Sequence, residues 1–151
     1  MAIISVNPAT EQEVARFEEH PREHVDKVLQ RAHDAQRDWR RLSFESRGSN
    51  LAQVARLLRV EKARLAALAT EEMGKPLVEA AAEVEKCAWS LDWYTENSAQ
   101  LLAAKEMPSN ATQSYVQYQP LGVLLAVMPW NFPYWQFFRA AAPALMAGNT
   151  I

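Results

Sequence analysis

The stretch that decides the fold reads Leu121-Gly-Val-Leu-Leu-Ala-Val-Met-Pro-Trp-Asn-Phe-Pro133 and continues into a helical run up to Gly148-Asn149. Residues 121–128 form an unbroken apolar run, as expected for a strand that is covered on both faces of a parallel sheet. Pro129 ends this strand because proline cannot donate to the ladder, and Pro133 suits the first turn of a helix. The turn between the prolines therefore lies outside the carboxyl end of a strand, where ligands bind in open α/β sheets.

The N-terminal residues predict a two-stranded hairpin followed by an amphipathic helix. Ile3–Val6 and Glu13–Phe17 are extended segments on either side of the turn-forming residues Asn7-Pro8-Ala9-Thr10. From Pro21 onward the apolar residues recur at helical spacing. We expect one buried helix face made of Val25, Val28, Leu29, Ala32, Ala35 and Trp39.

Two further long helices are predicted in the middle of the chain. Ser43 is a suitable N-cap for a helix that continues to Met73 and ends at Gly74, with Pro76 as a stop. Its basic residues alternate with glutamates and predict a solvated face: Arg47, Arg56, Arg59 and Lys62. The next helix, 79–102, carries an apolar stripe of Ala80, Val84, Cys87, Ala88, Leu91 and Tyr94.

After a loop at 107–111, residues 113–119 alternate in polarity and predict an antiparallel or edge strand. The chain therefore divides into residues 1–112, with the hairpin and helices, residues 113–120, with this strand, and residues 121–151, with the apolar strand, the turn and a last helix. Taken together, these elements predict an α/β protein.

Composition narrows the possible classes of protein. The chain has 151 residues, 49% of them hydrophobic, and a formal net charge of −2. This composition predicts a globular protein with no nucleic-acid footprint, no membrane span and no signal peptide. A single cysteine is consistent with a reducing cytoplasm. His20, His24 and His33 lack the spacing of metal ligands, so we expect no metal site.

Several motifs are similar to those of one enzyme family. Pro120-Leu-Gly-Val123, Pro129-Trp-Asn-Phe-Pro133 and Ala142-Pro-Ala-Leu-Met-Ala-Gly-Asn-Thr150 resemble the aldehyde dehydrogenase superfamily, and within it the bacterial succinate-semialdehyde dehydrogenases. The motifs Asn7-Pro-Ala-Thr10, Glu72-Met-Gly-Lys-Pro76, Glu83 and Cys87-Ala-Trp89 extend the resemblance over the whole chain. It implies the N-terminal part of a Rossmann-like NAD(P)-binding domain. It also implies that 113–120 begins an arm of a homo-oligomer, a dimer or a tetramer.

The resemblance assigns roles to the central turn. The family oxidises an aldehyde to an acid through a cysteine thiohemiacetal, with hydride passing to a nicotinamide. Oxyanion charge develops during the attack and needs a hydrogen-bond donor, and the family's oxyanion asparagine matches Asn131. From the residues alone, Asn131 could instead cap the following helix. Met128, Pro129, Trp130 and Asn131 match positions that contact the cofactor, although Trp130 could also be a packing aromatic.

The last helix, 134–147, contains a single arginine, Arg139. In the succinate-semialdehyde dehydrogenases the matching arginine binds the substrate carboxylate, which arginine can hold with two parallel hydrogen bonds. The other interpretation is a surface arginine whose stem lies on apolar neighbours. Phe132 and Trp135 are candidates for lining the same substrate pocket.

The resemblance places the nucleophilic cysteine, the glutamate base and the ribose-binding lysine after Ile151. Cys87 lies on the apolar stripe of a helix, so we expect a core residue and no nucleophile. Two hypotheses follow. In the first, the chain represents an NAD(P)-dependent succinate-semialdehyde dehydrogenase, with NADP favoured over NAD, and residues 1–151 alone are inactive. In the second, it is a non-catalytic module that binds cofactor or sibling subunits. We favour the first.

Overall fold

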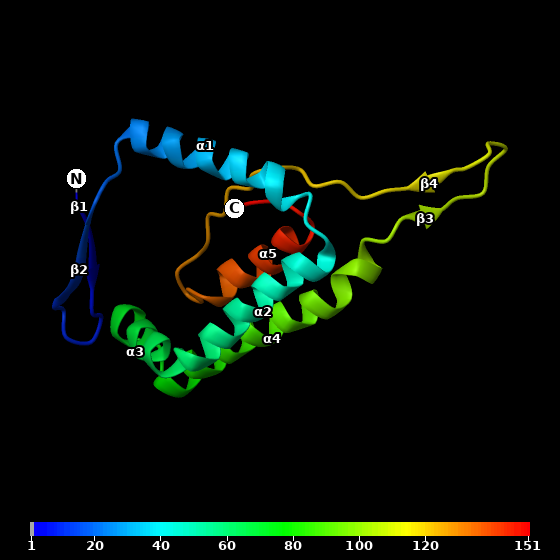
Figure 1. Cartoon of the computed structure of the whole chain (residues 1–151). Helices are drawn as coiled ribbons and strands as arrows, with labels where there is room; N and C mark the ends of the chain where they lie inside the picture. Colours follow the sequence, from blue (N-terminus) through cyan, green and yellow to red (C-terminus); the bar gives the residue numbers. More distant parts are fainter. Residues whose placement is uncertain (1) are drawn as a thin grey trace.

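The computed structural model describes residues 2–151 and contains two hairpins and a stack of helices (Figure 1). The elements in chain order are β1 (Ala2–Val6), β2 (Glu13–Glu18), α1 (Arg22–Trp39), α2 (Phe44–Val60), α3 (Lys62–Met73), α4 (Leu77–Leu101), β3 (Lys105–Glu106), β4 (Tyr115–Val116) and α5 (Trp135–Met146). The predicted mixture of helices and short strands is therefore present.

The N-terminal hairpin has the predicted turn chemistry. β1 and β2 pair antiparallel, with Ile3 opposite Phe17. The Asn7 side chain accepts hydrogen bonds from the amides of Ala9 at 2.9 Å and Thr10 at 3.2 Å. An asparagine that bonds to its own following backbone in this way fixes a tight turn, so Asn7 sets the reversal of the chain.

The predicted second helix is two helices. Ser43 caps α2 as expected, since its Oγ accepts from the Ser46 amide at 3.1 Å. The prediction of one helix to Met73 is wrong, because the helix breaks at Glu61, where φ is −86° and ψ is 3°. The break lets α2 and α3 both pack along α4. α3 then ends as predicted at Gly74, whose φ of 75° is readily adopted only by glycine.

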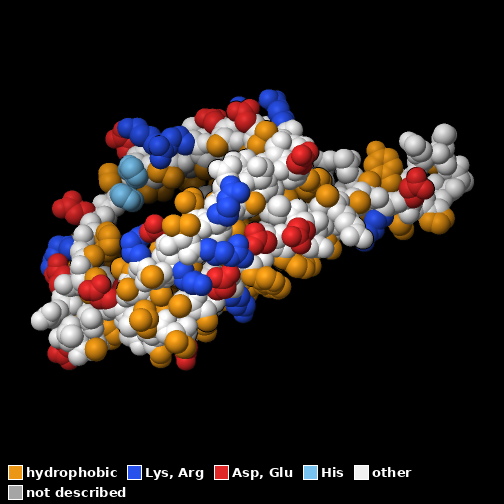
Figure 2. Space-filling model, turned by 60° about the horizontal axis from the view of Figure 1, so that its bottom comes forward, with side chains coloured by type: hydrophobic (Ala, Val, Ile, Leu, Met, Phe, Trp, Pro, Cys, Tyr) orange, Lys and Arg blue, Asp and Glu red, His pale blue; other side chains and the backbone are white. Residues whose placement is uncertain are grey.

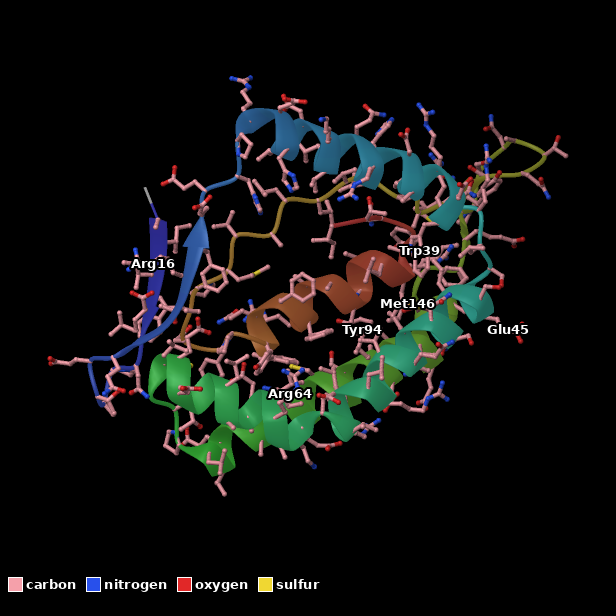
Figure 3. The ribbon with its side chains drawn as sticks, turned by 60° about the vertical axis from the view of Figure 1, so that its left-hand side comes forward. Arg16, Trp39, Glu45, Arg64, Tyr94 and Met146 are labelled. Atoms are coloured by element: carbon pink, nitrogen blue, oxygen red, sulfur yellow. The ribbon has the colours of Figure 1, made fainter. Side chains whose placement is uncertain are left out.

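The core lies between α2, α4 and α5. Small residues alternate with larger ones there, which lets the helices approach closely. Its buried members are Leu51, Ala55, Leu58, Val84, Cys87, Ala88, Leu91, Ala142 and Met146. Trp39, Tyr94 and Met146 point into the space enclosed by the helices (Figure 3), and Trp39 and Tyr94 pack against this cluster while partly buried. The apolar stripe predicted for α4 is thus confirmed, with Tyr94 at its edge.

The buried face predicted for α1 is wrong. Val25, Val28 and Leu29 are 44%, 39% and 52% exposed, and Gln36 is the buried residue of this helix. Periodicity identifies the apolar face of a helix but not the element that covers it, and α1 lies across the molecule apart from the bundle of α2, α4 and α5 (Figure 1). Side-chain hydrogen bonds attach it instead.

The strand predicted at 121–128 is also wrong as a covered strand. This segment runs extended between α1 and α5 (Figures 1 and 3), but its parallel pairing is one bridge between Val123 and Thr150. Leu121, Leu125 and Val127 are between 82% and 89% exposed. An apolar run predicts burial only when neighbouring strands and helices cover it, and here no second strand lies beside residues 125–128 in the described part of the chain.

The strand predicted at 113–119 is short and lies in a projecting arm. Only Tyr115–Val116 of this segment forms a strand, which pairs antiparallel with Lys105–Glu106. The β3–β4 hairpin extends away from the helices (Figure 1), and hydrophobic side chains lie on its surface (Figure 2). Over residues 2–151, no helix is long and apolar enough to cross a membrane.

Candidate active site

The turn that carries Asn131 lies between the extended segment and the start of α5. Trp130 is 76% exposed, and Asn131 is exposed as well. The Asn131 side chain forms no hydrogen bond with any residue in the part of the chain that the structure describes. The alternative that Asn131 caps α5 is wrong, because Tyr134 occupies the N-cap position. Its amide is therefore free to donate to a ligand.

A glutamate from α4 takes the place of that cap. Glu83 Oε1 accepts hydrogen bonds from the backbone amides of Tyr134 and Trp135, both at 2.9 Å. These amides belong to the first turn of a helix and have no partner within it. A carboxylate at this end is also favoured by the helix dipole. Glu83 therefore fixes the start of α5 directly after the turn.

Lys75 completes this arrangement from the loop between α3 and α4. Its ammonium group pairs with Glu83 Oε2, and both side chains are at most 5% exposed. The same ammonium lies 3.6 Å from the centre of the Phe132 ring. A buried charge pair is tolerated when each partner has further favourable contacts, and here those contacts are α5 and the ring of Phe132.

Side chains from α1 and α2 hold the other end of α5. Trp39 Nε1 donates to the Leu145 carbonyl at 2.8 Å, and Gln36 Nε2 donates to the Gly148 carbonyl at 3.2 Å. Arg47 Nε donates to the Met146 carbonyl at 3.0 Å. The last carbonyls of a helix need such partners. α5 is thus bonded to other helices at both ends.

The solvated face predicted for Arg47 is wrong. Arg47 is 5% exposed, donates to the carbonyls of Leu42 and Met146, and lies 4.6 Å from the centre of the Phe44 ring. Burial lowers the pKa of its guanidinium. Arg59 behaves more as predicted, since it pairs with Glu85 and Asp92 at the partly exposed surface.

Asn149 joins the extended segment to α5. Its Oδ1 accepts from the amides of Leu121 at 2.7 Å and Gly122 at 3.0 Å, and its Nδ2 donates to the Ala144 carbonyl at 3.1 Å. Both the oxygen and the nitrogen of its side-chain amide are therefore bonded within the chain. Asn149 sets the distance between the strand-like segment and the helix that follows the turn.

Two cavities flank the turn. One, of about 250 Å³, brings Phe132 and Trp135 together with charged residues of α4; its lining is Lys75, Glu79, Ala82, Glu83, Lys86, Phe132 and Trp135. The other, of about 560 Å³, is mostly apolar and lies between the hairpin, α3 and the turn, where it includes Trp130 and Pro133. Asn131 and Arg139 line neither of these two cavities.

The remaining predicted site residues lie on the surface or at its edge. Met128 is half-buried and Pro129 is exposed. Arg139 is exposed on α5 and forms no ion pair with the residues from 2 to 151. The structure therefore presents Arg139 to solvent or to a ligand, and its role in binding a carboxylate stays a prediction.

Cys87 is a core residue, as predicted. The side chain is fully buried. The pKa of the thiol is raised from 9.0 to about 12, mainly by desolvation and to a smaller extent by the nearby charge of Glu83. A thiol with so high a pKa is a poor nucleophile at neutral pH, so this residue does not attack a carbonyl.

Reasoning from sequence did not find the roles of Lys75, Glu83, Arg47 and Asn149. One signal was available for Glu83, which falls on the apolar stripe of α4 between Ala80 and Cys87. A carboxylate at such a position is buried and requires a partner. Its partners are distant in sequence, so only the fold identifies them.

Comparisons with known proteins identify the family to which the chain is similar. The model of the Aldehyde dehydrogenase family matches residues 1–151. The chain is 48% identical over 149 residues to a probable NADP+ succinate-semialdehyde dehydrogenase of Synechocystis, and 39% identical over 146 residues to the succinate semialdehyde dehydrogenase [NAD(P)+] Sad of Escherichia coli. These alignments cover 99% and 97% of this chain but 33% and 32% of the relatives.

Solved structures give the same result. A Streptococcus pyogenes succinic semialdehyde dehydrogenase in complex with NADP+ superposes with a TM-score of 0.92 at 35% identity, over 97% of this chain and 32% of its own. An E. coli lactaldehyde dehydrogenase superposes with a TM-score of 0.93 at 33% identity, over 100% and 32%. The chain spans about a third of the length of the relatives it matches. It belongs to the aldehyde dehydrogenase family.

Proposed function

We propose that the protein carrying this chain is an NAD(P)-dependent aldehyde dehydrogenase that oxidises succinate semialdehyde to succinate. One observation carries the proposal: Asn131 presents an unused amide on an exposed turn, while Glu83 takes over the capping of α5. A donor that is fixed before the reaction stabilises the charge that develops on the aldehyde oxygen at attack. The Synechocystis and Escherichia coli relatives that are similar in sequence are named for this substrate.

Arg139 is the proposed anchor for the substrate carboxylate. It lies on α5, the helix that starts directly after the turn, and is exposed without an intrachain ion pair among the described residues. A guanidinium can hold a carboxylate with two parallel hydrogen bonds. Phe132 and Trp135 would supply the apolar wall for the carbon chain, since they share one cavity.

The proposed cofactor is NADP+ or NAD+, with NADP+ favoured by the names of the relatives. When bound, it accepts the hydride of the substrate. The residues present fit the ring end of such a cofactor, because Pro129, Trp130 and Asn131 are all exposed at the end of the extended segment. Met128 completes this contact surface. These residues would bind and orient the nicotinamide in a Rossmann-like domain, of which 121–151 would supply an extended segment, a turn and a helix.

The proposed assembly is a homo-oligomer. Exposed apolar residues on the arm support this proposal: Met107, Tyr115, Val116 and Tyr118. The second candidate, a non-catalytic module, has its own support for residues 1–151 alone, because their single cysteine is buried with a pKa near 12.

The substrate proposal is tested in the full-length protein with Arg139→Ala. We expect KM for succinate semialdehyde to rise at least about tenfold, since an arginine–carboxylate contact contributes roughly 1.5–3 kcal/mol, while KM for a neutral aldehyde of similar length changes little. The matched control is Arg56→Ala, which removes an exposed arginine of α2. Equal effects on both aldehydes would contradict the carboxylate role, and wild-type protein without aldehyde oxidation would contradict the activity.

A further inference from the structure

The buried pair Lys75–Glu83 contacts the residues that directly follow Asn131 in the turn. The Lys75 ammonium lies 3.6 Å from the centre of the ring of Phe132, the next residue along the chain. Glu83 Oε1 accepts from the amides of Tyr134 and Trp135 at 2.9 Å. The two side chains are joined to each other by their charges. Together they link α4 and the loop before it to the turn.

The turn has few other attachments. Trp130 is 76% exposed, Phe132 is 42% exposed, and Pro129 and Asn131 are exposed. The N-cap residue Tyr134 makes no side-chain capping bond of its own. The prolines at 129 and 133 restrict the backbone torsions of the turn, but they do not attach it to the body of the protein. That attachment comes from Lys75 and Glu83 and, at Tyr134, also from the tyrosine hydroxyl, which donates to the Leu65 carbonyl of α3 at 2.8 Å.

We propose that Lys75 and Glu83 are positioning residues for the oxyanion donor Asn131. This inference rests on the proposed dehydrogenase function, because it assigns Asn131 the role of donor. Glu83 fixes the first turn of α5. Lys75 neutralises the charge of Glu83, and its ammonium group contacts the ring of Phe132, the residue next to Asn131. The amide of Asn131 is then held at one place relative to the aldehyde oxygen. Neither residue contacts the substrate oxygen in this assignment.

The effect of an oxyanion donor depends steeply on its distance from the reacting oxygen. A donor is useful only within hydrogen-bond range of the developing charge, and a misplacement of about 1 Å can cost roughly a hundredfold in rate. Charge-assisted hydrogen bonds are stronger than neutral ones. Replacing the Glu83 carboxylate by an amide therefore weakens the attachment while keeping the shape of the side chain.

The experiment measures single-turnover hydride transfer in the full-length protein for Glu83→Gln. We expect the rate to fall about tenfold to a hundredfold, with KM for the cofactor within about threefold of wild type. The matched control is Glu85→Gln, which changes the same group on the same helix where it pairs with Arg59 and Lys62 at the surface. This control should retain wild-type turnover.

A double-mutant cycle separates positioning from general support of the fold. If Glu83 acts through Asn131, Glu83→Gln in an Asn131→Ala background should cause no further loss beyond about twofold. A merely structural role would lower the rate by the same factor in both backgrounds, and that result would overturn the proposal. Hydrogen exchange of the amides of Tyr134 and Trp135 should accelerate in Glu83→Gln but not in Glu85→Gln.

A second variant keeps the test decisive if Glu83→Gln does not fold. Lys75→Met removes the charge while keeping an apolar stem against Phe132, and leaves the Glu83 cap in place. We expect a loss of turnover of about threefold to tenfold, again absent in the Asn131→Ala background. If both variants turn over at the wild-type rate, the positioning role is overturned. If the wild-type protein itself shows no turnover, the proposed function is overturned instead.

Discussion

At the scale of single residues, buried polar side chains with long-range partners hold the region around the turn. Asn149 is 6% exposed, and its amide serves the backbone of Leu121, Gly122 and Ala144. Removing a partner from a buried hydrogen-bonding group costs about 1–3 kcal/mol. The Asn149 side chain therefore stabilises the 121–124 segment together with the backbone hydrogen bonds between this segment and Thr150.

We predict that Asn149→Asp lowers the free energy of unfolding by about 2 kcal/mol, measured by urea denaturation. The carboxylate keeps the acceptors for Leu121 and Gly122 but faces the Ala144 carbonyl without a donor. Asn50→Asp is the control, since Asn50 also donates to a backbone carbonyl, that of Ser46, but on the exposed face of α2. A stability change as small as that of the control would show that the Ala144 contact contributes nothing.

Cys87 should be unreactive in the folded protein. With its pKa raised to about 12, the thiol should react slowly with iodoacetamide at pH 8 in native protein and rapidly in urea. Cys87→Ala/Ser109→Cys, which carries one thiol in the exposed arm loop, is the reactive control. Rapid labelling of native wild type would contradict the burial.

The raised pKa of Cys87 makes the free energy of unfolding depend on pH. The folded-state pKa is raised above the value of 9.0 expected for the unfolded thiol, so deprotonation favours unfolding. The contribution of Cys87 is intact below about pH 9 and is lost as pH rises toward 12.

The sequence predicts the position of the site but only some of the contacts of its residues. The motif located the turn, and the structure excludes the capping role for Asn131, but the roles of Asn131, Arg139 and the cofactor-contacting residues stay predictions. Glu83 and Lys75 could not be paired in advance with Tyr134 and Phe132, because those partners are more than fifty positions away along the chain. Spacing along a helix predicts which residues share a face but not which distant backbone they meet.

At the scale of elements, the contact between α2 and α4 depends on a missing side chain. A Cβ atom at Gly48 would lie 2.8 Å from Thr95 Cγ2. Glycine is usually unfavourable inside a helix, so its presence in α2 is explained by this close approach. The Thr95 methyl group occupies the space that an alanine would need.

We therefore predict that Gly48→Ala lowers the free energy of unfolding by about 1–3 kcal/mol through overpacking, despite the better helix propensity of alanine. Adding Thr95→Ser removes the methyl group and should recover most of the loss. Thermal and urea denaturation of the two variants check this. A stabilised Gly48→Ala protein would show that the helices can separate without cost.

Elements with local signals were predictable, and those with distant partners were not. The hairpin, the Ser43 cap, the Gly74 terminus and the core stripe of α4 follow from chemistry within a few residues. The break at Glu61 was missed because it serves the packing of α2 and α3 on α4. The exposure of Val25 and Leu29 on α1, and of Leu125 in the extended segment, was missed because periodicity says nothing about what covers a face.

At the scale of the whole molecule, the arm is the part that reaches farthest from the helices (Figure 1). Tyr115 and Val116 are 55% and 45% exposed at its paired strand. An exposed strand edge with apolar side chains is a site at which another chain can pair. This supports the proposed oligomer.

We predict that Tyr115→Ser/Val116→Ser in the full-length protein shifts the oligomer toward smaller species, measured by sedimentation velocity. The control is Val60→Ser, which removes a 77% exposed apolar residue at the end of α2. Unchanged sedimentation of the arm variant would place the subunit contact elsewhere.

The anchoring of α1 has a consequence for the order in which the chain folds. The hydrogen bonds of Gln36 to Gly148 and of Trp39 to the C-terminal end of α5 span 112 and 106 positions, whereas those of Arg59 and Lys62 to Glu85 span 26 and 23. During synthesis, α2, α3 and α4 can therefore associate early. At about 5–20 residues per second, Trp39 emerges roughly 5–20 s before the carbonyl that it binds, so α1 must wait undocked on the nascent chain.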